Sequence, residues 1–324
     1  MTKVNLITGF LGSGKTTLLL QLLQKKPANE NWAILVNEFG EIGIDGALLR
    51  AGGATLKEIP GGCMCCVNGL PMQVGLNSLL QQHKPDRLLI EPTGLGHPKQ
   101  LLKLLSSDVY ADWLQLNATL TLLDPRQLAD EKILSDENFR DQLTAADVIV
   151  ASKADRWMAE DHTRLAQWQQ QQARVRPLVT AQWGDIPLSL LDHPRDPATA
   201  LPDARHHHHH PDRSGFAALK LDGPTRWRRA VNQGQGYFSC GWLFDADTEF
   251  DGEGVQAWLA ELPVERVKGR LRTPQGVLTL NRQGDDVQIT LQDESTTDSR
   301  IELIHREQMD WNRLQSQLLK LRLT

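Results

Sequence analysis

Short apolar runs alternate with longer amphipathic stretches through the first half of the chain. This pattern is typical of proteins in which buried strands and covering helices follow one another. We expect strands at residues 4–7, 32–36, 55–59, 87–90, 118–123, 148–151 and 177–180, and helices at 18–23, 70–82 and 163–173. The order predicts an α/β fold in which helices cover a mostly parallel sheet.

The hydrophobic pattern changes near residue 190. Residues 193–211 are rich in proline, charge and histidine, which favours an exposed linker. Beyond it, short apolar runs predict strands at 216–221, 237–244, 264–271, 277–280, 287–291 and 301–304, with helices at 254–262 and 310–321. We therefore expect a first domain over residues 1–190, a linker over 191–214 and a smaller α+β domain over 215–324.

Composition and charge exclude several classes of protein. The chain has 324 residues, of which 40% are hydrophobic and 23% charged, as in a globular protein long enough for two domains. Its net charge of −5 argues against nucleic-acid binding, because phosphate contacts need a basic face. No apolar run is long enough to span a bilayer, and the first predicted strand begins too early for a signal peptide. We expect a cytoplasmic protein with no nucleic-acid or membrane partner.

A glycine-rich motif, G-x-x-x-x-G-K-T, lies between the first predicted strand and the first predicted helix. The backbone N–H groups of such a turn and of the helix N-terminus form a concave site for phosphate. In this arrangement the lysine reaches the β- and γ-phosphates and the threonine hydroxyl coordinates Mg²⁺. The motif predicts a nucleotide site formed by Gly9, Gly12, Ser13, Gly14, Lys15, Thr16 and Thr17.

Two residues after the strand predicted at 87–90 extend this site. Glu91 and Gly94 stand at the carboxyl edge of the sheet, where open α/β folds bind their ligands. Glu91 is a candidate for the Mg²⁺ shell or for orienting water, and the Gly94 amide for a contact with the γ-phosphate. An acid that only caps the turn is the alternative for Glu91.

The sequence S-K-x-D follows the strand predicted at 148–151 and bears on the choice of base. The Asp155 carboxylate can accept both the ring N–H and the exocyclic amine of guanine, a pair that adenine does not offer. Lys153 would lie along the base or support the phosphate loop. GTPases usually have asparagine in place of Ser152, and the shorter side chain is expected to lose some contacts to the purine and to the phosphate loop. The position of the motif still favours GTP.

Three of the four cysteines stand together in C-M-C-C, preceded by two glycines. Thiolates are soft ligands suited to Zn²⁺, and glycine permits the tight turn that brings neighbouring sulfurs to one ion. The cluster predicts a metal site at Cys63, Cys65 and Cys66, with a fourth ligand or water; burial as small hydrophobic side chains is the alternative. The fourth cysteine, Cys240, lies in a strand pattern and is expected in a core, and we expect packing roles for Trp227, Trp242 and Trp258.

Taken together, these motifs resemble those of the CobW-like P-loop GTPases. The resemblance extends to V-N-E-F-G-E-I-G-I-D at 36–45, E-P-T-G-L-G-H-P at 91–98 and the loop at 180–187, and so covers most of residues 1–190. It reaches E-R-V-K-G-R-L at 265–271 more weakly, in a segment similar to the family's smaller domain. Within the family, the zinc-binding members are the most similar.

The resemblance implies a GTPase that hydrolyses GTP to GDP and phosphate, binds zinc or another divalent transition metal, and acts in metal delivery or zinc homeostasis. It implies that Glu38 lies near the metal and that Glu41 or Asp45 lies in the nucleotide-sensing loop, where an acid orients water. A recipient metalloprotein is expected, but the sequence does not identify it. Alternatives are an ATP-dependent kinase or synthetase for a small molecule, a zinc-buffering protein whose nucleotide site is structural, and cobalt insertion.

Five consecutive histidines occupy residues 206–210, within the expected linker. Neutral imidazoles bind Zn²⁺ and Ni²⁺, so we favour a collecting site for such ions over a linker without a role. The tract could also bridge chains through metal, in a metal-dependent homo-oligomer. Because the cysteine motif lies between the two segments expected to sense the γ-phosphate, we expect metal binding and GTP binding to be coupled.

Overall fold

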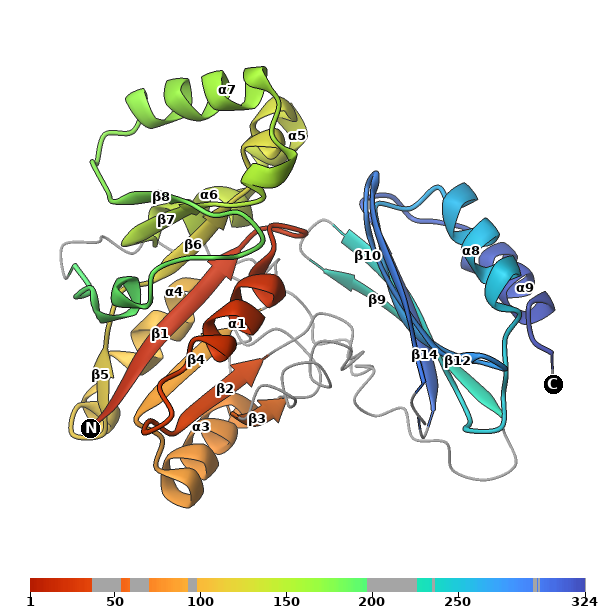
Figure 1. Cartoon of the computed structure of the whole chain (residues 1–324), viewed down its shortest axis with the longest axis horizontal. Helices are drawn as coiled ribbons and strands as arrows, with labels where there is room; N and C mark the ends of the chain where they lie inside the picture. Colours follow the sequence, from red (N-terminus) through yellow and green to blue (C-terminus); the bar gives the residue numbers. More distant parts are fainter. Residues whose placement is uncertain are drawn as a thin grey trace. The chain divides into compact units, whose positions relative to one another are not determined.

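The computed structural model describes residues 1–36, 54–58, 70–92, 98–196, 226–234, 237–293, 296 and 298–323 (Figure 1). These residues form two compact units, one that extends to residue 196 and one that begins at residue 226. No helix within the described ranges is long and apolar enough to cross a membrane. The predicted limits of the linker, 191 and 214, stay predictions.

The first unit is organised around a parallel sheet. Its strands lie in the order β3-β2-β4-β1-β6-β7-β8, each parallel to its neighbours, and β5 also pairs in parallel with β1. The predicted parallel α/β fold is confirmed; β5, with three residues, is too short to appear as an apolar run of its own. The strands are β1 (Thr2–Gly9), β2 (Trp32–Val36), β3 (Thr55–Glu58), β4 (Arg87–Glu91), β5 (Leu114–Leu116), β6 (Leu120–Leu123), β7 (Val148–Ala151) and β8 (Leu178–Thr180).

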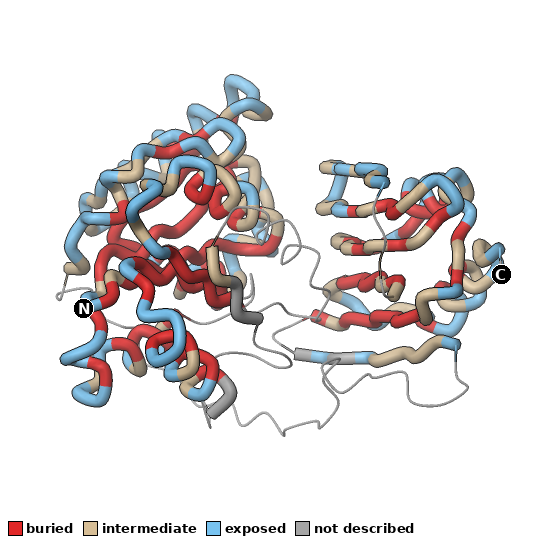
Figure 2. Tube along the Cα trace, turned by 60° about the horizontal axis from the view of Figure 1, so that its bottom comes forward, coloured by how far each residue is buried: buried red, intermediate tan, exposed pale blue. Residues whose placement is uncertain are grey.

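Helices cover both faces of this sheet, and its strands are buried between them (Figures 1 and 2). Successive residues of one strand face opposite sides: Leu6 belongs to the core that includes α3 and α4, whereas Ile7 belongs to the core that includes α1. We did not predict α4, α5 or α6; each has eight residues or fewer and so makes little more than two turns. The helices are α1 (Lys15–Gln24), α3 (Leu70–His83), α4 (Pro98–Leu105), α5 (Glu131–Ser135), α6 (Glu137–Thr144) and α7 (Ala159–Gln170).

The second unit is a six-stranded antiparallel sheet with two helices, which confirms the predicted α+β architecture. The strand order is β13-β12-β11-β14-β10-β9, and β14 runs antiparallel to both of its neighbours, β10 and β11. The strand predicted at 216–221 lies outside the described residues. The elements are β9 (Trp227–Gly234), β10 (Tyr237–Phe244), α8 (Gly252–Glu261), β11 (Arg266–Thr273), β12 (Gly276–Gln283), β13 (Asp286–Gln292), β14 (Ser299–His305) and α9 (Trp311–Lys320).

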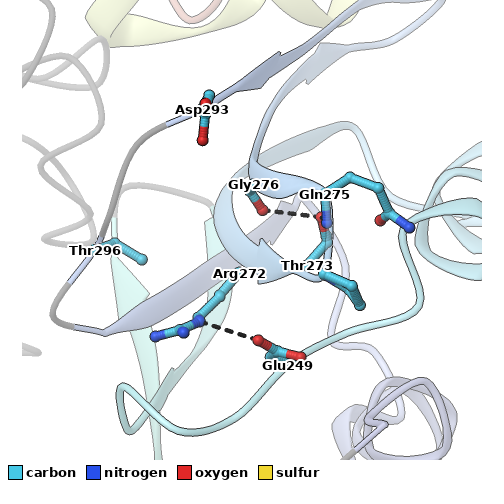
Figure 3. A pocket seen from close by; sticks show the side chains of 8 residues that line it. Glu249, Arg272, Thr273, Gln275, Gly276, Asp293 and Thr296 are labelled. Carbon is cyan, nitrogen blue, oxygen red and sulfur yellow. Dashed lines mark hydrogen bonds and ion pairs between the residues drawn. The ribbon is translucent and has the colours of Figure 1, made fainter.

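A shallow polar depression borders the turn between β11 and β12 (Figure 3). Two hydrogen bonds join residues of its lining: Arg272 Nε donates to Glu249 Oε1 at 3.3 Å, and Thr273 Oγ1 donates to the Gly276 carbonyl oxygen at 2.9 Å. These bonds close the hairpin and fix its connection to the preceding loop. The depression therefore has a structural explanation.

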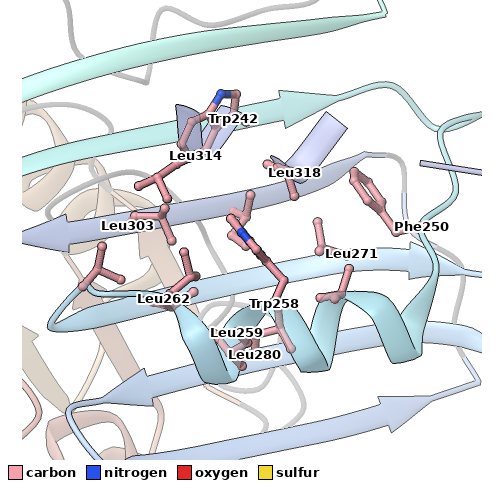
Figure 4. Close-up of a cluster of buried hydrophobic side chains, with 14 of the residues drawn as sticks. Trp242, Phe250, Trp258, Leu259, Leu262, Leu271, Leu280, Leu303, Leu314 and Leu318 are labelled. Carbon is pink, nitrogen blue, oxygen red and sulfur yellow. The ribbon is translucent and has the colours of Figure 1, made fainter. Parts of the chain in front are cut away.

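The core of the second unit lies between its sheet and its helices (Figure 4). Trp242 from β10 and Trp258 from α8 are buried there, and their indole N–H groups donate to Gln315 and Gln317 of α9 at 3.3 and 3.1 Å. The predicted packing roles of these tryptophans are confirmed, and Trp227 packs against the same core. Cys240 is fully buried beside them, and burial raises the pKa of its thiol to about 12, as expected of a core residue.

Candidate nucleotide-binding site

The phosphate loop joins β1 to α1 at the carboxyl edge of the parallel sheet. β1 ends at Gly9, where φ is 149° and a Cβ would lie 2.6 Å from Ser13 Oγ and 2.8 Å from the Leu122 carbonyl oxygen. Gly14, with φ at 98°, is the N-cap of α1 and has no side chain to cap the first turn. The N–H groups of that turn therefore face a site suited to an anion.

Lys15 folds back over this loop. Its ammonium donates to the carbonyl oxygens of Gly9 at 3.0 Å and Phe10 at 3.4 Å, and only 7% of the residue is exposed. A buried ammonium needs such partners, because charge is strongly disfavoured away from water. The two carbonyls hold the positive charge within the loop, where nucleotide phosphates are bound in this motif. Thr16 follows in the first turn of α1 and is partly exposed.

Ser13 also fits a loop shaped for phosphate. It is fully buried, and within the described part of the chain its hydroxyl has no hydrogen-bond partner. Buried hydroxyls are normally paired, so an unpaired one in a glycine-rich loop calls for an explanation. A Cβ at Gly9 would overlap this hydroxyl at 2.6 Å, so the backbone of the loop is packed closely at this point. The residues present thus suit a polyphosphate.

Two side chains from later strands hold the loop in place. Ser152, directly after β7, donates from Oγ to the Ser13 carbonyl oxygen at 2.7 Å. Gln127, in the short helix η2 (Pro125–Ala129), donates from Nε2 to the Leu11 carbonyl oxygen at 2.9 Å. Ser152 therefore keeps a direct bond to the phosphate loop, and the expectation that serine loses some of the contacts of asparagine stays a prediction.

Lys153 is fixed by an acid that the sequence analysis did not select. Its backbone is left-handed, with φ at 57°, and its Nζ lies 3.6 Å from Oδ2 of Asp124, the residue that follows β6. Asp124 is buried and accepts from Arg126 Nε at 3.0 Å and Nη2 at 2.7 Å. The position of Asp124, immediately after a buried strand, was the signal that could have identified it.

Asp155 is held by the loop that follows β8. Its Oδ1 accepts from the Trp183 amide at 3.2 Å. The same loop pairs with the motif through its backbone, since the Ala154 amide donates to the Ala181 carbonyl oxygen at 3.1 Å. Asp155 therefore stands at the same sheet edge as the phosphate loop, with a second oxygen, Oδ2, that lies 3.8 Å from Arg156 Nε. Trp183 was not among the predicted site residues.

Glu91 ends β4 at this edge and is buried, aligned in register with Val36 at the end of β2. The structure thus brings together the phosphate loop, Glu91 and the S-K-x-D motif at the carboxyl ends of neighbouring parallel strands, where open sheets bind ligands. Several predicted site residues lie outside the described residues: Gly94, the acid Glu41 expected to orient water, and Glu38, Cys63, Cys65 and Cys66, which were expected at the metal. Within the ranges that the structure describes, no group of three or more His, Cys, Asp or Glu side chains could hold a metal ion.

Comparison with known proteins identifies both units. Residues 3–180 match the nucleotide-binding domain described as CobW/HypB/UreG, and residues 239–322 match the cobalamin synthesis protein cobW C-terminal domain. The chain is 61% identical over 324 residues to the zinc chaperone YeiR of Escherichia coli K12, which covers 100% of this chain and 99% of that protein.

Two further matches are more distant. The zinc chaperone YjiA of Escherichia coli K12 is 35% identical over 196 residues, covering 58% of this chain and 60% of that protein. A crystal structure of Zn(II)-bound YjiA GTPase from E. coli aligns with a TM-score of 0.44 at 21% identity, covering 99% of each chain. Because the nucleotide-binding domain model matches more than half of its length, the chain belongs to the CobW/HypB/UreG family.

Proposed function

We propose that this protein is a zinc-binding GTPase that hydrolyses GTP to GDP and phosphate and acts in zinc delivery or zinc homeostasis. The observation that carries the nucleotide assignment is the Ser152–Ser13 bond, which fixes the S-K-x-D motif to the phosphate loop at 2.7 Å. One nucleotide could then contact both segments, its base at Asp155 and its phosphates at Lys15. The full-length similarity to a zinc chaperone supports the assignment of the metal.

Guanine is favoured by the geometry around Asp155. A carboxylate held by the Trp183 amide can accept the N1–H and the exocyclic amine of guanine together. Adenine presents an acceptor at N1 and would leave the carboxylate facing a lone pair. Lys153, held by Asp124, lies beside it and can cover the base with its alkyl chain.

Catalysis in this site is positioning and charge stabilisation. The first-turn amides of α1 and the Lys15 ammonium neutralise charge that develops on the β- and γ-phosphate oxygens. The Thr16 hydroxyl and Glu91 would hold Mg²⁺, which supplies further positive charge to these oxygens when it is bound. Glu41 is our candidate for orienting the attacking water, and the Gly94 amide for a contact with the γ-phosphate.

The cargo is held, on this proposal, by Cys63, Cys65 and Cys66 with Glu38 nearby, and the histidines at 206–210 collect ions for it. Thiolates suit Zn²⁺ on chemical grounds. Asn37 and Glu38 follow β2 in the sequence, and the last residue of β2 is in register with Glu91, which supports a metal site near the nucleotide site. Coupling between them must be reciprocal: nucleotide changes zinc affinity by the factor by which zinc changes nucleotide affinity. The recipient is a metalloprotein that accepts the ion.

Hydrolysis of GTP and ATP across a zinc series, with wild type, Lys15→Ala and Cys65→Ser, tests the proposal. We expect GTP to be preferred over ATP, Lys15→Ala to abolish turnover, and zinc to change the GTP rate of the wild type but not of Cys65→Ser. A preference for ATP would overturn the guanine assignment. Zinc-independent rates in the wild type would overturn the metal-responsive function while leaving the GTPase assignment intact.

A further inference from the structure

The loop after β8 holds a tryptophan in a backbone conformation that suits glycine or asparagine. Trp183 and Gly184 have φ of 52° and 76°, and the Asp185 amide donates to the Gln182 carbonyl oxygen at 2.8 Å, which closes a four-residue turn around them. Positive φ at both central positions is the geometry of a type I′ turn, where Asn, Asp and Gly are preferred. A bulky side chain at such a position is a genuine outlier.

Packing does not explain the choice of tryptophan. The residue is 59% exposed, whereas Trp32 and Trp242 are buried in cores. An exposed indole gives up most of the apolar burial that normally stabilises this side chain. Asparagine would fit the turn with less strain and leave less apolar surface in water. A residue that is poor for the backbone and poor for packing indicates a functional role.

The turn is anchored on two parts of the nucleotide site. Gly184 packs against the first turns of α1, where a Cβ would lie 2.8 Å from the Leu18 nitrogen. Further along the same helix, Lys25 Nζ donates to the Ile186 carbonyl oxygen at 2.9 Å. On its other side the Trp183 amide donates to Asp155 Oδ1 at 3.2 Å. The turn therefore spans from the helix of the phosphate loop to the carboxylate assigned to guanine.

We propose that the Trp183 indole forms a wall of the purine pocket and stacks on the base of the bound nucleotide. The inference rests on the proposed function, because Asp155 defines where the base lies. Asp155 and Trp183 have different roles in this pocket. The Asp155 carboxylate selects guanine, and the Trp183 indole adds affinity without selecting a base, since every base has a π face. The backbone amide of Trp183 additionally orients Asp155, and that contact survives replacement of the side chain.

Calorimetric titration of GDP into Trp183→Asn, Trp183→Phe and the control Trp113→Asn tests this inference. Trp113 is similarly exposed, at 53%, but its carbonyl pairs with the Thr2 amide at the opposite edge of the sheet. We expect about a tenfold loss of GDP affinity in Trp183→Asn, in the range for loss of a base-stacking aromatic residue. Trp183→Phe should stay within about threefold of the wild type, and Trp113→Asn should not change. Equal affinities of wild type and Trp183→Asn would overturn the proposal.

Thermal unfolding separates stacking from a structural role. Asparagine suits a type I′ turn, so nucleotide-free Trp183→Asn should unfold at or above the wild-type temperature. A lower unfolding temperature with a matching loss of affinity would mean that the indole supports the turn, and would overturn stacking. Energy transfer from tryptophan to bound N-methylanthraniloyl-GDP adds a direct readout, which should fall in Trp183→Phe more than in Trp113→Phe.

A second background distinguishes this inference from the proposed function. Asp155→Asn should exchange guanine for xanthine, because an amide can donate to the xanthine carbonyl. In that background Trp183→Asn should weaken XDP by the same factor as it weakens GDP in the wild type. If Asp155→Asn shows no gain for XDP, the guanine assignment fails whatever Trp183 does; if XDP gains but is insensitive to Trp183, the stacking inference fails alone.

Discussion

Replacing Ser152 by alanine removes the hydroxyl that ties the S-K-x-D motif to the phosphate loop. The bond is short, 2.7 Å from Oγ to the Ser13 carbonyl oxygen, and Ser152 is only 3% exposed, so water cannot substitute for it. Losing a hydrogen bond costs about 0.5–1.5 kcal/mol, and leaving a buried partner unsatisfied raises this to about 1–3 kcal/mol. Alanine creates almost no cavity. We expect the free energy of unfolding, without nucleotide, to fall by about 1–2 kcal/mol.

The effect on nucleotide affinity has an upper bound. The binding free energy changes only if nucleotide must reorder the phosphate loop of the variant when it binds. The loss of binding free energy therefore cannot exceed the net free energy that the Ser152–Ser13 hydrogen bond contributes. A value of about 1.4 kcal/mol corresponds to a tenfold weaker Kd. We therefore expect GDP affinity to fall between about threefold and tenfold in calorimetric titration.

Ser107→Ala is the matched control for this prediction. Ser107 Oγ donates to the Leu104 carbonyl oxygen, also at 2.7 Å, but this bond lies just after α4 and does not involve the phosphate loop. Ser107→Ala should lower the free energy of unfolding modestly and leave GDP affinity unchanged. If Ser152→Ala destabilises the protein but binds GDP as Ser107→Ala does, then the bond does not link base and phosphate sites, and that reasoning is refuted.

Three further predictions concern the loop, the pH dependence and the buried thiol. Gly9→Ala should abolish GDP binding in calorimetry and lower the free energy of unfolding in denaturant by about 1–3 kcal/mol, because the added Cβ would lie 2.6 Å from Ser13 Oγ. The control is Gly284→Ala, which is also at positive φ but has nothing within 4 Å of the added Cβ. Hydrogen bonds from Lys3 and then Arg87 lower the pKa of Asp192 below its ordinary 3.8, so the ionised carboxylate stabilises the fold above that pH, and this stabilisation is lost as pH falls through the folded pKa. In urea titrations, Asp192→Asn should therefore be less stable than wild type near neutrality, and the difference should disappear under acid conditions. In a variant with Cys63, Cys65 and Cys66 replaced by serine, Cys240, with a pKa of about 12, should resist alkylation at mildly alkaline pH. Mass spectrometry should show its modification only after denaturation, and rapid labelling of the native protein would contradict its burial.

The fold could be predicted where burial determines the sequence. Strands of the parallel sheet are covered on both faces, so β2 and β7 are continuous apolar runs and β4 has an apolar centre between Arg87 and Glu91. β9 escaped prediction because it is an edge strand whose sequence is dominated by arginine and amide side chains, and its strand conformation comes from pairing with β10. A strand that forms because it pairs with a neighbouring strand, rather than because both of its faces are buried, shows little hydrophobic pattern in its own sequence.

The same distinction holds for the site: residues fixed by local backbone geometry could be predicted, and residues that act through distant contacts could not. The phosphate loop was predictable because its glycines are required by backbone geometry at fixed spacing, as Gly9 shows. Asp124, Gln127 and Trp183 were missed, since each acts through a contact made only when strands distant in sequence become neighbours. Asp124 reaches Lys153 because β6 lies beside β7, and Trp183 reaches Asp155 because β8 lies beside β7.

Ser152 shows how such contacts change the interpretation of a motif. Serine in place of asparagine predicted weaker support of the phosphate loop, yet the hydroxyl reaches Ser13 and Gln127 supports the loop at Leu11. The expected loss of contact with the purine stays a prediction. Trp183, held at the turn beside Asp155, would supply affinity on that side of the nucleotide. If an asparagine at position 152 and the Trp183 indole would occupy the same space, Ser152→Asn should be better tolerated in Trp183→Asn than in the wild type.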